Sequence, residues 1–215
     1  MHLKRQEIPK NWPVHRKGTK YVIRPSSDLA SGVPVLIFMR DMLEMVQNRK
    51  ELKRAIHQKN ILLNGKPVRD ERASILLFDV IAIVPSKKYY KLGLKTNGKL
   101  EVQEVKENEA QSKFSKIVNK KMMRGKKTQI NLLDGNNFLS EIKCNTGDSV
   151  LVDFKDRKIE KCVPLGEKSK ILIFAGKHAG KTGQLEKIDK ENQVGEVDIE
   201  GKPISVLIKQ MMAVE

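Results

Sequence analysis

The stretch from Leu36 to Val84 constrains the fold most, because it carries signals for two short helices followed by a hairpin. Apolar residues recur there at steps of three and four, the spacing of one buried helix face, at Leu36, Met39, Leu43 and Val46. Asn48, with Glu51 three residues later, is typical of a helix N-terminus with a capping box. We therefore expect a first helix over residues 36–46 and a second from Arg49 to about residue 58.

A β-hairpin is expected directly after the second helix. Ile61-Leu62-Leu63 predicts a strand, Asn64-Gly65 suits a type I′ turn, and Lys66 to Val68 predicts the returning strand. The apolar run 76–84 then predicts a further strand, which closes a small sheet over the helices.

The second predicted helix carries a basic face. Its side chains are spaced at i, i+3, i+4 and i+7, at Lys50, Lys53, Arg54 and His57. Like charges at these spacings repel by roughly a few tenths of a kcal/mol per pair, so the pattern favours a polyanionic partner. A solvated basic face without a ligand stays the alternative for this helix taken alone.

The order of these residues resembles the alpha-L (S-four-type) RNA-binding motif. The resemblance rests on Arg40-Asp41-Met42-Leu43, Arg49, Ala55-Ile56, Ile61-Leu62-Leu63-Asn64-Gly65-Lys66 and Asp79-Val80-Ile81. Lys59 stands where the motif commonly has a helix-ending glycine. We expect Asn60 to adopt the left-handed conformation in its place.

The net charge of the chain limits the kinds of partner that it can bind. A net charge of +16 and a pI near 9.8 favour nucleic acid or an anionic membrane surface. The sequence contains neither a run of eighteen apolar residues nor an apolar signal region, so we expect no membrane span and no signal peptide. Cys144 and Cys162 predict reduced structural thiols, and four scattered histidines predict no metal site and no cofactor.

Residues 1–34 are expected to form a basic N-terminal arm. Seven basic and two acidic residues give the segment a net charge of +5, and its prolines favour an extended, irregular chain. Trp12 lies among basic residues and predicts stacking on RNA bases, with Lys4, Arg5, Arg16 and Lys17 beside it. We expect an arm that becomes ordered in folded RNA, with a disordered tail as the alternative. The series His2-Leu3-Lys4-Arg5, Pro9, Trp12 and Arg16-Lys17 is similar to the opening of the small-subunit ribosomal protein S-four-e family of archaea and eukaryotes.

Residues 86–165 predict a middle domain of short strands resembling a small barrel. Turn residues separate the expected strands 89–94, 100–105, 128–133, 149–154 and 159–163, and a short helix is expected through Ala110, Phe114, Ile117 and Val118. The densest basic run of the chain follows this helix, and residues 85–165 carry a net charge of +8. We expect a phosphate-binding loop with Lys120, Lys121, Arg124, Lys126 and Lys127, although a solvated loop would show the same composition.

The last segment, residues 166–215, has no net charge. Ala175 to Thr182 fits a relaxed nucleotide-binding loop pattern, but such a loop must open a helix, and Gly183 and Asp189 leave no room for one. A strand, a glycine-rich turn and a returning strand fit better. That arrangement resembles the KOW motif, whose loop would carry Lys177, His178 and Lys181 and bind RNA or protein.

Taken together, the sequence predicts an α+β, mainly β chain: an extended arm (1–34), an alpha-L RNA-binding domain (35–85), a middle β-barrel-like domain (86–165) and a C-terminal SH3-like KOW barrel (166–215). The resemblance to the S-four-e family implies a cytoplasmic structural constituent of the small ribosomal subunit. Its implied partners are ribosomal RNA and neighbouring ribosomal proteins, with no membrane and no small-molecule substrate. The RNA contacts would include Arg49, Lys50, Lys53, Arg54, His57 and Lys66. No group is poised for catalysis. The alternatives are a KOW-containing transcription or assembly factor and an RNA-modifying enzyme.

Overall fold

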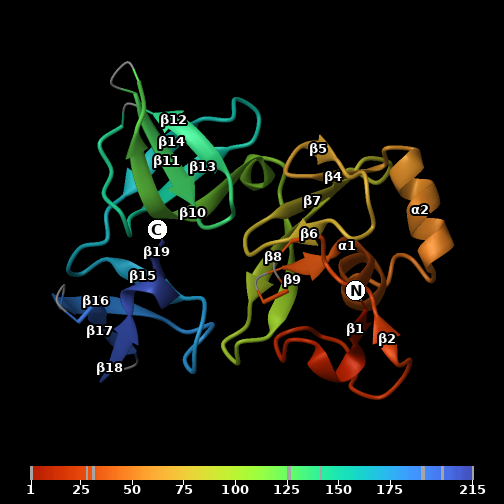
Figure 1. Cartoon of the computed structure of the whole chain (residues 1–215), viewed down its shortest axis with the longest axis horizontal. Helices are drawn as coiled ribbons and strands as arrows, with labels where there is room; N and C mark the ends of the chain where they lie inside the picture. Colours follow the sequence, from red (N-terminus) through yellow and green to blue (C-terminus); the bar gives the residue numbers. More distant parts are fainter. Residues whose placement is uncertain are drawn as a thin grey trace. The chain divides into compact units, whose positions relative to one another are not determined.

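The computed structural model describes residues 2–27, 29–30, 32–124, 127–140, 142–189, 192–199 and 201–214 (Figure 1). The chain forms two compact units. Unit 1 comprises residues 1–94 and 99–111, and unit 2 comprises residues 95–98 and 112–215. Strands dominate both units and helices are few, which confirms the predicted α+β, mainly β class.

Unit 1 is built on one antiparallel five-stranded sheet. In spatial order its strands are β5 (Lys66–Pro67), β4 (Ile61–Leu63), β7 (Val80–Ile83), β8 (Lys88–Leu94) and β9 (Leu100–Val105). The predicted hairpin is confirmed, since Asn64 (φ 49°) and Gly65 (φ 75°) both have the positive φ of a type I′ turn. The Asn64 side chain also fixes the neighbouring strand, because its Oδ1 accepts the backbone N–H of Val80 at 2.9 Å.

The boundary predicted between residues 85 and 86 is wrong. β8 and β9 pair with β7, so they extend the sheet of unit 1 and do not begin a separate domain. Tyr90, Leu92 and Leu100 accordingly lie in the same core cluster as Ile61 and Ile81. A local pattern of strands and turns does not reveal which neighbour a strand will choose, which is why the boundary was misplaced.

The first helix is shorter than predicted. α1 (Val35–Ile37) continues as one π-helical turn, η2 (Phe38–Met42), and Leu43 closes it by donating to the Phe38 carbonyl at 3.0 Å. Glu44 then has a φ of 54°, a left-handed conformation that ends the helix before Val46. Val46 is buried nonetheless, so the periodic apolar positions marked burial correctly but not the helix length.

Helix α2 (Arg49–His57) is confirmed. Asn48 caps it by accepting the Glu51 N–H at 3.0 Å, and Glu51 in turn accepts the N–H of Gln47 at 2.9 Å. The expectation for its C-terminus is wrong by one residue, because Lys59 itself has the left-handed φ of 57°. Asn60 donates to the Ala55 carbonyl and Lys59 to the Ile56 carbonyl, which is the Schellman pattern.

The N-terminal segment packs onto unit 1, which corrects the expectation that it becomes ordered only in RNA. β1 (Leu3–Lys4) pairs with β2 (Tyr21–Val22), and a 3-10 turn, η1 (Arg5–Glu7), lies between them. Leu3 and Trp12 are each 4% exposed and belong to the core of the unit. The Asn11 carbonyl accepts the N–H of Leu100 at 3.0 Å, which ties the segment to strand β9. Unit 1 is completed by the short strands β3 (Val33–Pro34) and β6 (Ser74–Ile75), which pair with each other, and by the 3-10 turn η3 (Glu109–Gln111).

Unit 2 contains two antiparallel five-stranded sheets, each with its own apolar core. The first has the order β12 (Asn137–Ser140), β11 (Thr128–Leu132), β10 (Ser112–Met122), β13 (Ser149–Asp153) and β14 (Ile159–Val163). The helix predicted through Ala110 and Val118 is wrong, because residues 112–122 form the long strand β10. This strand pairs first with β13 and then, past an irregularity near Val118, with β11.

Two lysines of β10 are buried, and each has a different partner. Lys113 forms an ion pair with Asp134, and the side chains of both residues are almost fully buried. Burial alone would raise the pKa of Asp134, but the charge and hydrogen bond of Lys113, with hydrogen bonds from Asn136, lower it overall. Lys116 instead donates to the carbonyl oxygens of Ile208 and, at 2.7 Å, Met211. Burial lowers the pKa of Lys116 to about 8.

The second sheet of unit 2 has the order β18 (Lys202–Leu207), β17 (Val194–Ile199), β16 (Thr182–Asp189), β15 (Lys170–Ile173) and β19 (Met211–Ala213), with a 3-10 turn, η4 (Ile208–Gln210), before the last strand. Residues 174–181 form turns and lead directly into β16, as the strand–turn–strand interpretation predicts. Gly183 lies close to the next strand, since a Cβ at this position would sit 2.2 Å from the Asp198 carbonyl oxygen.

Candidate nucleic-acid interface

Helix α2 presents the basic face that the sequence predicts. Leu52 and Ile56 are buried against unit 1, so the opposite side of the helix faces solvent. The five basic side chains on it are all exposed: Arg49, Lys50, Lys53, Arg54 and His57. Exposed cations at one-turn spacing match a chain of phosphates better than a single small anion.

A buried carboxylate orders one edge of this face. Glu71 is 3% exposed, and its Oε1 accepts a hydrogen bond from Arg49 Nε at 2.7 Å and a second from the same guanidinium. Lys53 Nζ lies 3.8 Å from Glu71 Oε2. The hydrogen bonds and then the charge of Glu71 raise the pKa of Arg49. Because Glu71 restrains Arg49 and Lys53, the unrestrained cations of the helix are Lys50, Arg54 and His57.

Some predicted RNA-binding residues of the N-terminal segment are exposed, and others bind within the protein. Lys4, Arg16 and Lys17 are exposed, as is Lys66 on strand β5 of the same unit. Arg5 is used internally, since its guanidinium donates to the Thr19 carbonyl at 2.7 Å, to the His15 carbonyl at 2.6 Å and to Thr19 Oγ1 at 2.8 Å. Arg5 therefore holds a loop of its own chain, and its contact with RNA stays a prediction.

Trp12 does not offer a ring for stacking. Its side chain is packed in the core of unit 1, and a nucleobase has no access to either face of the indole. In the sequence, this aromatic residue lies among cations. The same pattern is found where a ring is exposed for stacking and where a ring is buried as an anchor. The structure corrects the first interpretation to the second.

The basic hairpin between β10 and β11 keeps three of its predicted cations exposed: Lys121, Arg124 and Lys127. Lys120 is half-buried and donates its ammonium to the Cys144 carbonyl, so its charge faces the protein. Lys126 lies outside the described residues. Met122, which is 78% exposed, stands next to Lys121. In the loop between β15 and β16, Lys177 is exposed, whereas His178 and Lys181 are half-buried.

Across the described ranges, no three His, Cys, Asp or Glu side chains are placed to share a metal ion. Cys144 and Cys162 are free thiols, and burial, followed by the neighbouring Cys144 and Asp148, raises the pKa of Cys162 to about 12. None of the described helices has the length and apolar character to cross a membrane.

Sequence reasoning missed two residues that shape these surfaces. Glu71 lies in the charged run Arg69-Asp70-Glu71-Arg72, whose mixed charges are typical of a solvated turn, and only its burial identifies it as an anchor for α2. Lys10 is not among the residues that the sequence singles out, yet it is exposed and lines a cavity beside the Trp12 ring.

Comparisons with known proteins agree with this architecture. The model of the ribosomal family S4e matches residues 86–159, and the RS4NT domain matches residues 1–27. The small ribosomal subunit protein eS4 of Nanoarchaeum equitans is 33% identical to this chain, with 88% of this chain and 82% of that protein covered. The eS4 protein of Methanocella arvoryzae is 34% identical, with 87% and 80% covered.

A solved structure supports the fold. The crystal structure of the 30S ribosomal protein S4e from Thermoplasma acidophilum superposes with a TM-score of 0.73 at 24% identity, and covers 87% of this chain and 96% of that one. The relatives above are more than 30% identical and are covered over four fifths of their length. This chain therefore belongs to the ribosomal protein S4e family.

Proposed function

We propose that this chain is a structural component of the small ribosomal subunit, held on ribosomal RNA through contacts to backbone phosphates. Its relatives are named as small ribosomal subunit proteins, and the chain matches them over most of its length. The observation that carries the RNA-binding part is the exposed basic face of α2, where Lys50, Arg54 and His57 have no acidic partner among the described residues. Protein neighbours in the subunit belong to the same proposal.

The arrangement of α2 suits phosphates more than bases. Lysine and arginine at the helix surface bind phosphate oxygens wherever the RNA backbone passes, and such contacts position a protein without reading sequence. The exposed cations of the β10–β11 hairpin, Lys121, Arg124 and Lys127, add a second group of contacts in unit 2. A protein of this kind acts by holding RNA, and its side chains have no reaction to perform.

Co-sedimentation tests the assignment to the ribosome. The purified chain is added to small subunits that have been stripped of it with high salt, and the mixture is centrifuged through sucrose. The proposal predicts stoichiometric recovery with the small subunit. Recovery in the free fraction only would instead favour a transcription or assembly factor.

The salt dependence of RNA binding tests the α2 face. Replacing Lys50, Lys53 and Arg54 by glutamine removes up to three phosphate contacts, so the log–log slope of affinity against salt should fall by roughly 2–3. A control variant neutralises three exposed lysines of unit 1 outside this helix: Lys87, Lys88 and Lys106. A slope for the α2 variant that equals that of the unsubstituted chain would mean that α2 does not touch the RNA backbone.

A further inference from the structure

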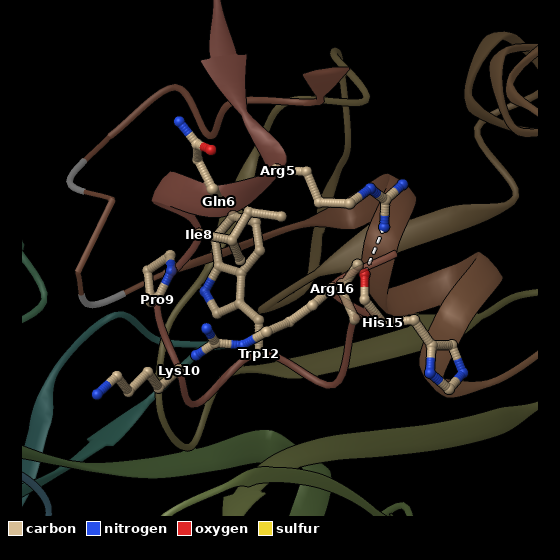
Figure 2. A pocket seen from close by; sticks show the side chains of 9 residues that line it. Arg5, Gln6, Ile8, Pro9, Lys10, Trp12, His15 and Arg16 are labelled. Atoms are coloured by element: carbon tan, nitrogen blue, oxygen red, sulfur yellow. Dashed lines mark hydrogen bonds between the residues drawn. The ribbon is translucent and has the colours of Figure 1, made fainter. Parts of the chain in front are cut away.

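A small cavity lies in the N-terminal segment of unit 1, with a volume of about 50 Å³ (Figure 2). Its walls come from residues 5–16, so it is formed by one continuous stretch of chain. Arg5 builds one side, because its guanidinium clasps the turn at His15 and Thr19. This cavity is therefore shaped by hydrogen bonds that the folded segment already makes.

Trp12 brings an unused hydrogen-bond donor to this cavity. The residue is 4% exposed, yet its indole Nε1 has no acceptor among the described residues. Figure 2 shows the nitrogen-bearing edge of the ring on the side where Pro9, Lys10 and Arg16 lie, away from His15. A buried N–H without a partner destabilises a fold, so an acceptor at this position is favoured. Because an indole N–H can only donate, the missing group must be an acceptor.

The charges around the cavity specify that acceptor further. Lys10 and Arg16 line it, and their side chains are exposed and have no ion-pair partner in the described structure. The lining contains no Asp or Glu. Two free cations and one neutral donor, without an opposing carboxylate, select an anion. Because both cationic side chains are exposed, they are able to rotate and admit a group to the indole edge.

Size narrows the choice among anions. One water needs roughly 10–15 Å³ on this measure, so 50 Å³ holds a group of about three to five heavy atoms. That is the size of a phosphoryl group and less than that of a nucleobase. We propose that this cavity binds one phosphoryl group, with Trp12 Nε1 as its neutral donor and Lys10 and Arg16 as its charged partners.

This inference rests on the proposed function, which makes an RNA backbone phosphate the natural occupant. It deepens that function by giving Trp12 a definite task. The residue donates its N–H to a phosphate, while its buried ring packs in the core and does not stack on RNA bases. Free phosphate offers the same chemistry, so the experiment below compares both sources.

The single tryptophan makes the test direct, because the chain labelled with nitrogen-15 gives one indole N–H resonance. Inorganic phosphate and a fragment of small-subunit ribosomal RNA are titrated in turn, with chloride at matched ionic strength as the blank. A downfield shift of this resonance and slower exchange of its proton with RNA support an RNA phosphate. The same changes with inorganic phosphate alone support a free-phosphate site. If neither probe moves the resonance beyond the chloride blank, the inference is overturned.

Variants of the full-length chain separate the donor from the ring. Replacing Trp12 with β-(3-benzothienyl)alanine keeps the bicyclic shape and removes the N–H, so affinity for the occupying probe should fall about tenfold, the loss expected for one hydrogen bond to a charged acceptor. Lys10→Gln combined with Arg16→Gln should abolish the resonance shift. Lys87→Gln with Lys106→Gln removes the same charge from exposed positions outside the cavity and should leave the shift in place.

Failure of this inference can be distinguished from failure of the proposed function. RNA binding that responds to the α2 variants while the Trp12 resonance stays unchanged would overturn the phosphoryl site alone. Loss of co-sedimentation with a persistent phosphate-induced shift would overturn the ribosomal assignment and leave the site standing.

Discussion

The buried pair Lys113–Asp134 allows a quantitative prediction about the stability of unit 2. Its two side chains are 2% and 6% exposed, so water cannot solvate either charge when the other residue is removed. Removing one partner of such a pair costs about 3–5 kcal/mol, because an uncompensated charge stays buried. We expect Lys113→Met and Asp134→Asn each to lower the free energy of unfolding of unit 2 by that amount.

The double variant supplies the decisive comparison. Lys113→Met combined with Asp134→Asn leaves no buried charge, and an asparagine at position 134 still accepts the Asn136 N–H that Asp134 now accepts at 3.0 Å. The double variant should therefore cost less than the two single variants together, by about 2–3 kcal/mol. Single-variant effects that are small and simply add would refute the argument that these charges depend on each other.

The assay must report on the correct unit. Trp12 lies in unit 1, so its fluorescence does not follow the unfolding of unit 2. Urea titration followed by far-UV circular dichroism, with hydrogen exchange of the β10 and β11 amides, measures the stability at issue. The lowered pKa of Asp134 also predicts how the stability of unit 2 changes with pH. Its contribution to stability is full above the unfolded pKa, near 4, and is lost as pH falls through the lower folded value, so Asp134→Asn should flatten this acid dependence.

Three further predictions concern single positions. The folded pKa of Lys116, about 8, lies below the unfolded value of 10.5. The free energy of unfolding of unit 2 should therefore increase as pH rises from 8 to 10.5, by up to about 3 kcal/mol. Urea titrations of Lys116→Met should show no such increase. Lys59→Gly should raise the thermal stability of unit 1 by about 0.5–1 kcal/mol, because it removes the backbone strain of a lysine in the left-handed conformation. Lys99→Gly, at a position without positive φ, should not stabilise the unit. Gly183→Ala should lower the stability of the C-terminal sheet by roughly 2 kcal/mol or more, because the added methyl meets the Asp198 carbonyl. Gly166→Ala, where a Cβ meets nothing within 4 Å and φ is not positive, should cost less in the same calorimetric scan.

The elements that sequence predicted well are those specified by neighbouring residues. Asn48 and Glu51 interact across one helical turn, and Asn64-Gly65 sets its own backbone geometry, so α2 and the β4–β5 hairpin could be recognised from a few positions. The basic face of α2 followed directly from the helix period, which made it the best-predicted part of the interface.

Errors arose where distant residues decide the outcome. In β10, Phe114 and Ile117 happen to share a helical spacing. The strand is instead specified by its pairing with β13 and by the burial of Lys113 against Asp134, which follows 21 residues later, beyond strand β11. Likewise, nothing local to Arg5 shows that its donors are occupied by His15 and Thr19. Charge can be counted from a sequence, but whether a charge faces solvent depends on tertiary structure.

The bond between the Asn11 carbonyl and Leu100 has a consequence for how the protein is made. The first residues leave the translating ribosome long before their partner strand exists, since roughly 90 residues separate the two ends of this contact. At about 5–20 residues per second, the basic N-terminal segment waits between roughly 5 and 20 seconds with Leu3 and Trp12 uncovered. During synthesis this segment is therefore a nascent chain open to chaperones and to RNA, and it closes onto its own domain only when β9 emerges.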